Sequence, residues 1–196
     1  MLKKLLPILL CLLFTSPVLA RDWLGCWHED KAEGLTGLER CAWREGERLR
    51  LAPAFMRRTR FGRDGLGALV IAGQWYYVKR DGRLLPVVTF DNGPDYFEEG
   101  LTRSLQSGGI AWYDRSFRQV IAPRYDWGAP FYKGRAEVCR GCVESAPDGD
   151  GHRSMVGGEW GVIDRHGRAV EPLKALKASS PGAASSGNPF QLPAAR

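Results

Sequence analysis

Apolar and polar residues alternate along most of the chain, and Gly or Pro interrupts this alternation roughly every ten residues. Alternation with a period of two is typical of β-strands that bury one face, and closely spaced turn residues favour antiparallel pairing. No segment after residue 20 requires a helix. The pattern predicts an antiparallel all-β fold, whose clearest strands are Gly65–Ile71, Gln74–Lys79, Leu84–Val88, Ile110–Asp114 and Gln119–Pro123.

Glycine-containing turns separate several of these strands. Gly46 lies between Cys41–Trp43 and Leu49–Leu51, where a tight hairpin needs a residue that can adopt a positive φ. Asp81-Gly82 is a strong hairpin signal between two further strands. We therefore predict β-hairpins at both places.

The hairpin pattern recurs about every 35 residues, which indicates stacked supersecondary units. Trp75–Lys79 has counterparts at Ile110–Asp114 and at Glu159–Asp164. The last copy is delayed by an insert, residues 143–157, which is rich in Gly, Asp, Ser and Pro and is predicted to be a loop.

Phe90-Asp91 and Tyr125-Asp126 occupy equivalent positions in two successive repeats, so we expect them in similar environments. Each Asp is expected to cap a turn by accepting backbone N–H groups, rather than to act as a catalytic acid or base. A single hairpin cannot bury both of its faces, so the recurring Trp, Tyr and Phe are expected at seams between units. Both a propeller-like circle and a linear stack of hairpins fit this pattern.

Two stretches carry a family resemblance. One is Trp160-Gly161-Val162-Ile163-Asp164 with the following Gly167. The other runs through Val120–Asp126 and continues as Phe131–Val138. Together they resemble the WG-repeat family, also written KWG, whose pattern is a Trp-Gly strand, an Ile-Asp, a Gly turn, a Val-Ile-Pro strand, Tyr-Asp and then Phe-x-x-Gly.

The resemblance extends over most of residues 38–172, as three clear copies and a faint N-terminal one. The copies depart from the pattern in places, since Tyr76 follows Trp75 and Ile110 replaces the Trp of the middle copy. The resemblance implies a repeat array with no common enzymatic activity. It therefore favours an interaction or structural module.

The first 20 residues have the features of a secretory signal peptide. Lys3 and Lys4 precede the apolar run Leu5–Phe14, and Val18-Leu19-Ala20 fits a cleavage site. We therefore predict a periplasmic or secreted protein without a membrane span. Residues 21–172 are predicted to form one domain. Residues 173–196, mostly Ala, Ser, Gly, Pro and Lys, are predicted to be a disordered tail.

The predicted mature chain is mildly basic, because loss of two Lys lowers the net charge from +6 to +4. Arg57, Arg58 and Arg60 belong to an Arg-rich segment at 44–63, which acidic residues dilute. These side chains could bind lipopolysaccharide phosphates, peptidoglycan carboxylates or an acidic protein face. They could also be an ordinary solvated face. Export makes nucleic acid an improbable partner.

Four cysteines follow the predicted signal peptide, and an even number in an exported chain indicates disulfides. We favour the local pairs Cys26–Cys41 and Cys139–Cys142, although four cysteines allow other connectivities. A redox or metal role for Cys139 and Cys142 is less favoured, because a Gly- and Asp-rich loop follows where a redox motif has a helix. Asp148-Gly149-Asp150-Gly151 lacks the ligand pattern of a calcium loop. No metal or cofactor is expected.

Aromatic side chains on the strands are the remaining candidates for function. Trp75, Tyr77, Trp112 and Trp127 could line an open binding groove or could be core residues of the repeats. No nucleophile elbow or paired-carboxylate motif is evident. The sequence predicts an exported, non-catalytic repeat module that binds a protein partner in the bacterial envelope. The alternatives are a cell-wall glycan or peptidoglycan binder, a structural spacer and an envelope hydrolase.

Overall fold

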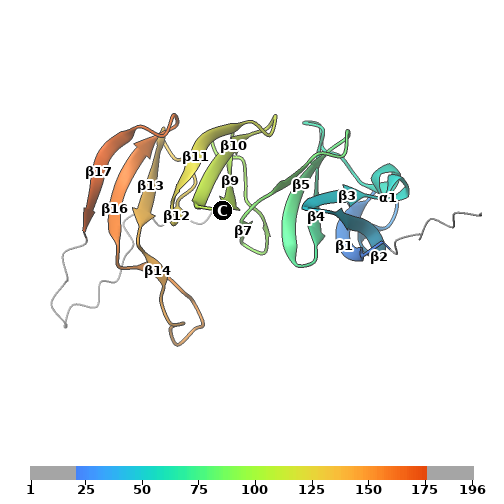
Figure 1. Ribbon diagram of the computed structural model, residues 1–196, viewed down its shortest axis with the longest axis horizontal. Helices are drawn as coiled ribbons and strands as arrows, with labels where there is room; N and C mark the ends of the chain where they lie inside the picture. Colours follow the sequence, from blue (N-terminus) through green and yellow to red (C-terminus); the bar gives the residue numbers. More distant parts are fainter. Residues whose placement is uncertain (1–20, 176–196) are drawn as a thin grey trace, which may run out of the picture.

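The computed structural model describes residues 21–175, and its β-sheets follow one another in a row (Figure 1). The predicted signal peptide and residues 176–196 of the predicted tail lie outside the described residues. Within the described part, no helix is long and apolar enough to cross a membrane. The row of sheets resolves the two arrangements that the sequence left open in favour of a linear stack.

The first unit is a six-stranded antiparallel sheet in the order β3-β2-β1-β4-β5-β6. One of its faces covers an apolar cluster that includes Cys26, Cys41, Leu69 and Val78. Its strands are β1 (Trp23–Asp30), β2 (Gly34–Glu45), β3 (Arg48–Leu51), β4 (Leu66–Ile71), β5 (Gln74–Lys79) and β6 (Leu84–Pro86).

A short helix, α1 (Pro53–Arg58), follows β3 and corrects the prediction that no helix is present. Pro53 begins the helix, where its missing N–H costs nothing and its fixed φ suits the first turn. The Phe55 carbonyl oxygen accepts hydrogen bonds from the backbone N–H and the hydroxyl of Thr59, at 3.0 and 3.1 Å. Burial of Phe55 in the cluster stabilises this turn beyond its own weak helical tendency.

The second and third units are smaller antiparallel sheets. The second has the order β11-β10-β9 and the third has the order β12-β13-β16-β17. Their strands are β9 (Leu101–Gln106), β10 (Gly109–Asp114), β11 (Gln119–Tyr125), β12 (Trp127–Gly128), β13 (Arg135–Arg140), β16 (Glu159–Asp164) and β17 (Ala169–Ala175). Two small hairpins complete the fold: β7 (Thr89–Phe90) with β8 (Gly93–Pro94), and β14 (Val143–Glu144) with β15 (Met155–Val156).

The turns after β5, β10 and β16, one in each unit, confirm the hairpin repeat. The backbone N–H of Lys79, Asp114 and Asp164 donates to the carbonyl four residues later, at 2.9, 3.0 and 2.9 Å. The residue just before that acceptor has a positive φ in every copy, namely Gly82, Phe117 and Gly167. The same turn geometry is thus built from different residues, as expected for diverged copies of one unit.

Three details differ from the prediction. Phe90 is 38% exposed whereas Tyr125 is 7% exposed, so these counterparts lie in unlike environments. The cause is local, because Asp91 and Asn92 adopt positive φ and turn the chain into the β7–β8 hairpin.

The insert at 143–157 is not only a loop, since β14 pairs with β15 at its base. Finally, β17 runs to Ala175, beyond the predicted domain boundary at 172.

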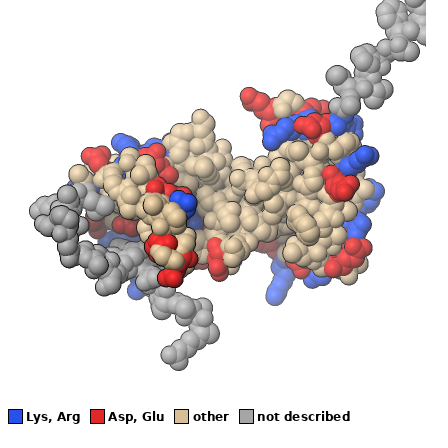
Figure 2. All heavy atoms as spheres, turned by 90° about the horizontal axis from the view of Figure 1, so that it is seen from below, with Lys and Arg blue, Asp and Glu red and all other residues tan. Residues whose placement is uncertain are grey.

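The two seams between the units differ in chemistry. Between the second and third units the seam is apolar and is centred on Trp112, which is fully buried and packs edge-on against Phe131 at 5.9 Å. On β9 of the second unit, Arg103 forms a buried ion pair with Asp95 (Nη2–Oδ1, 2.6 Å) and donates to the carbonyl of Gly128 in the third unit at 2.8 Å. The link to the first unit is polar too, because the Tyr77 hydroxyl donates to the Asp95 carbonyl oxygen at 2.8 Å. Charged side chains gather over both ends of the underside, and the surface between them is largely uncharged (Figure 2).

Candidate interaction surface

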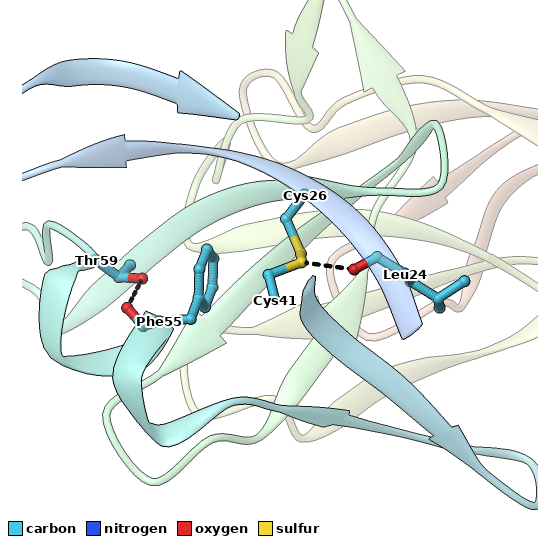
Figure 3. The surroundings of a disulfide bond; sticks show 5 residues. All are labelled: Leu24, Cys26, Cys41, Phe55 and Thr59. Atoms are coloured by element: carbon cyan, nitrogen blue, oxygen red, sulfur yellow. Dashed lines mark hydrogen bonds between the residues drawn. A yellow bond between two sulfur atoms is a disulfide. The ribbon is translucent and has the colours of Figure 1, made fainter. Parts of the chain in front are cut away.

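The two predicted cysteine pairs both form disulfides. Cys26 and Cys41 have a Cα–Cα distance of 5.8 Å, and Cys139 and Cys142 one of 6.1 Å. Figure 3 shows the first pair beside Phe55, with the Cys41 sulfur 3.2 Å from the Leu24 carbonyl oxygen. A disulfide sulfur has no proton, so this is a close contact and not a donated hydrogen bond. The first disulfide joins β1 to β2 and fixes which face of β1 points inward.

Because side chains alternate along a strand, the inward position of Cys26 directs Trp27 to the opposite face. Cross-strand pairing then places one row of residues on that outer face: Gly37 opposite Trp27, Trp27 opposite Val70, and Val70 opposite Trp75. Leu35 lies in the next row of the same face. We call Trp27, Leu35, Val70 and Trp75 the aromatic face.

The aromatic face leaves much of its apolar surface in solvent. Trp27 is 57% exposed and Leu35 is 71% exposed. A Cβ atom added at Gly37 would lie 3.2–3.3 Å from three atoms of the Trp27 indole, so the ring lies over this glycine. Exposed large apolar side chains that adjoin one another often mark sites where proteins interact. This face is therefore an exposed apolar patch, which makes it the candidate interaction surface.

The predicted aromatic groove is not formed as a single site. Trp112 is fully buried in a seam, so its assignment to a binding surface is wrong. Trp127 is half-buried against Trp160, at 5.7 Å between ring centroids. Tyr77 is half-buried against Phe97, and its burial raises the pKa of its hydroxyl to about 12. Only Trp75 among the four predicted aromatics belongs to the aromatic face.

The three predicted arginines have different roles. Arg58 pairs with Asp30 (Nε–Oδ2, 2.7 Å) and with Glu33. The pKa of Asp30 is lowered to about 2, first by the backbone N–H of Ala32 and then by Arg58. Arg60 pairs with Glu29 at 3.2 Å. Arg57 is exposed and forms no salt bridge with any described residue.

A basic depression lies beside this arginine segment. Its first hollow has a volume of about 490 Å³ and is lined by Lys31, Arg60, Phe61, Gly62, Arg63 and Arg80. An adjoining hollow of about 440 Å³ shares Arg80 and is lined also by Leu49, Arg50, Leu51, Pro53, Met56, Arg57, Asp81 and Gly82. The sequence did not predict this site, because its cations come from separate segments. The Arg-rich segment was its only signal.

Several carboxylates serve as turn caps. Oδ1 of Asp114 and of Asp164 accepts the backbone N–H two and four residues later. These bonds, with that from Arg168, lower the pKa of Asp164 to about 2. Asp126 caps as predicted, by accepting the Gly141 N–H at 2.5 Å, whereas no such bond is formed by Asp91 within the described chain.

Glu137 and a cluster in the insert are the remaining acidic candidates for a chemical site. Burial raises the pKa of Glu137, which lies on β13. Asp148, Asp150 and His152 gather in the insert with ligand atoms within 4.8 Å of one another, and all three are exposed. Asp148 Oδ1 already accepts the backbone N–H groups of the other two. These hydrogen bonds explain why the three side chains lie together, because Asp148 caps the loop that contains them.

Comparisons with known proteins identify the repeat. Residues 111–141 match a family model described as WG containing repeat, a segment that runs from β10 to the loop after β13. Neither the curated proteins nor the solved structures gave a match. The matched segment holds most of the β10–β11 hairpin of the second unit and the first two strands of the third, β12 and β13. This match confirms, for residues 111–141, the resemblance to the WG-repeat family that the sequence indicated.

Proposed function

We propose that the protein is an exported, non-catalytic repeat module that binds a protein partner in the bacterial envelope through its aromatic face. The features of residues 1–20 and the two disulfides support export, because disulfides persist in oxidising compartments. The observation that carries the binding proposal is the exposure of Trp27 in a row with Val70 and Trp75. Trp residues dominate the energy of many protein interfaces.

The face is suited to this role because its scaffold is rigid. The Cys26–Cys41 disulfide holds β1 against β2, and the opposite face of the sheet packs on the apolar cluster. A rigid aromatic side chain loses little conformational entropy when a partner covers it. The surface is therefore arranged before any partner arrives, which favours affinity.

The proposal is tested by affinity capture from envelope extracts with the mature protein as bait. The wild type is compared with Trp27→Ala and with Leu105→Ala, which removes an apolar side chain that is 64% exposed on β9. We expect one protein to be retained by the wild type and by Leu105→Ala, and to be lost with Trp27→Ala. The captured protein is then purified and its affinity measured by calorimetry, where Trp27→Ala should weaken binding at least about tenfold.

A glycan ligand is the second candidate, because the Trp27 ring lies over Gly37 as a platform on which a flat apolar sugar face could stack. Retention on insoluble peptidoglycan, with the same variants, separates the two candidates. Retention there that requires Trp27, with no protein captured, would replace the protein partner by the glycan. Equal behaviour of Trp27→Ala and wild type in both assays would reject the aromatic face altogether.

A further inference from the structure

The basic depression combines uncompensated positive charge with an apolar floor. Lys31, Arg57, Arg63 and Arg80 line it, and none of them pairs with a carboxylate of the described residues. Asp81 is the one acidic residue of its lining, and it forms a salt bridge with Arg83 (Nε–Oδ2, 2.8 Å). These four cations therefore lack a carboxylate partner, whereas Arg50 and Arg60 of the same lining pair with Glu45 and Glu29.

The positive groups come from three parts of the fold. Lys31 follows β1, Arg57 lies in α1 and Arg80 lies in the turn after β5. The Lys31 ammonium donates to the Arg57 carbonyl oxygen at 2.8 Å, which ties the end of β1 to the helix. Folding thus collects cations that would repel one another, and a bound anion would relieve that repulsion.

Arg80 is held in a definite orientation. Its guanidinium lies over the Phe61 ring, 4.7 Å from the ring centroid. A guanidinium stacked on an aromatic face keeps its N–H edges free for a carboxylate, which it can bind through two parallel hydrogen bonds. Leu49, Leu51, Pro53 and Met56 add apolar surface beside these donors.

We propose that the basic depression docks an acidic segment of a partner polypeptide, in which Asp or Glu residues alternate with apolar ones. Charge complementarity selects the carboxylates, and the apolar floor receives the side chains between them. A free phosphate would leave the floor uncovered, and a concave site is poorly shaped for a flat bilayer. This site is separate from the aromatic face, and the inference does not depend on the function proposed for that face.

The test uses the full mature protein and a fluorescein-labelled 12-residue peptide of alternating Glu and Leu, followed by fluorescence polarisation. Arg63→Gln with Arg80→Gln removes two charges from the depression, and Arg135→Gln with Arg153→Gln removes two exposed charges at the other end of the chain. We expect the first double variant to bind at least about tenfold more weakly and the second to match the wild type. The wild-type affinity should also fall as salt rises, because the charges are exposed.

Three probes separate the possible ligands: the peptide with Gln in place of Glu, inorganic phosphate, and vesicles containing phosphatidylglycerol. None of them should bind at concentrations where the Glu peptide does. The inference is overturned if the Glu peptide fails to bind, if both double variants bind it equally, or if phosphate or vesicles bind while the peptide does not. Circular dichroism spectra of the variants verify that each remains folded.

Discussion

Trp112 in the second unit and Trp27 in the first unit show how one residue type serves two purposes in this protein. Both lie on β-strands, where Trp27 is paired with Gly37 and Val70, and Trp112 with Ile121 and Arg103. Trp112 is fully buried, whereas Trp27 is 57% exposed. The difference is the neighbour, because the third unit stacks over Trp112 while no described element covers Trp27.

The comparison also shows how closely neighbouring sheets can pack. A Cβ atom at Gly128 would lie 2.4 Å from the Trp112 indole, so the third sheet approaches that ring through a glycine. Gly37 lies under the Trp27 indole, but there the glycine belongs to the same sheet. Where two sheets meet, the aromatic ring becomes core. On the outer face of the first sheet, no other described sheet packs against Trp27. Its ring therefore remains in solvent and available for a partner.

The largest expected effect on stability comes from replacing Trp112, the buried residue of the two. Trp112→Ala should lower the free energy of unfolding by about 3–5 kcal/mol, because the cavity left in the seam cannot collapse onto the flanking sheets. Trp27→Ala should change it by less than about 0.5 kcal/mol, as at an ordinary exposed site. Urea unfolding followed by circular dichroism measures both. Similar losses for the two variants would contradict the contrast.

Breaking the buried Arg103–Asp95 ion pair should lower the free energy of unfolding by a comparable amount, through a different mechanism. Asp95→Asn leaves the Arg103 guanidinium buried without its countercharge and should cost about 3–5 kcal/mol. The double variant Asp95→Asn with Arg103→Met should recover part of that loss, since the unpaired charge is then gone. Asp81→Asn breaks an exposed pair with Arg83 and should cost less than about 1 kcal/mol. Chemical denaturation at low and high salt provides the measurement.

The disulfides should also differ in their effect. Cys26→Ser with Cys41→Ser opens a loop with a sequence separation of 15 residues, and should destabilise the protein by about 3 kcal/mol. Cys139→Ser with Cys142→Ser opens a separation of only 3 residues and should cost less. Thermal unfolding of both variants tests this order. A larger loss for the second pair would mean that the insert contributes more to the third sheet than its exposure indicates.

The smallest expected effect concerns the turns, where Asp164 caps the third unit and Lys79 stands at the equivalent place in the first. Its hydrogen bonds lower the pKa of Asp164 to about 2 in the folded protein, below the usual Asp value of 3.8. Its contribution to stability is therefore present above pH 3.8 and is lost as the pH falls through 2. Asp164→Asn should lower the urea midpoint slightly at pH 7, and the difference should vanish near pH 2. A difference that persists in acid would contradict this origin.

Turns and disulfides were predictable from the sequence because their causes are local. Gly46 and Gly82 allow positive φ, and the spacing of Cys26 and Cys41 fits neighbouring strands. The helix at Pro53–Arg58 was missed because its stability comes mainly from burial of Phe55, which no local signal reveals.

The surface was harder to predict because it depends on which unit covers which face. Trp112 carries the same pattern signal as Trp75, yet only Trp75 lies on the aromatic face. One available clue was overlooked: a disulfide-bonded Cys26 points inward, so its neighbour Trp27 must point outward. The basic depression depends on segments that meet only in the folded chain, and pattern analysis cannot assemble them.

Side-chain labelling tests the central contrast most directly. Hydroxyl-radical oxidation, followed by mass spectrometry, is applied to the mature protein alone and with the captured envelope partner bound. The account predicts that Trp27 is oxidised readily in the free protein and is protected in the complex, whereas Trp112 is protected in both. Ready oxidation of Trp112 in the free protein, or unchanged oxidation of Trp27 in the complex, would contradict it.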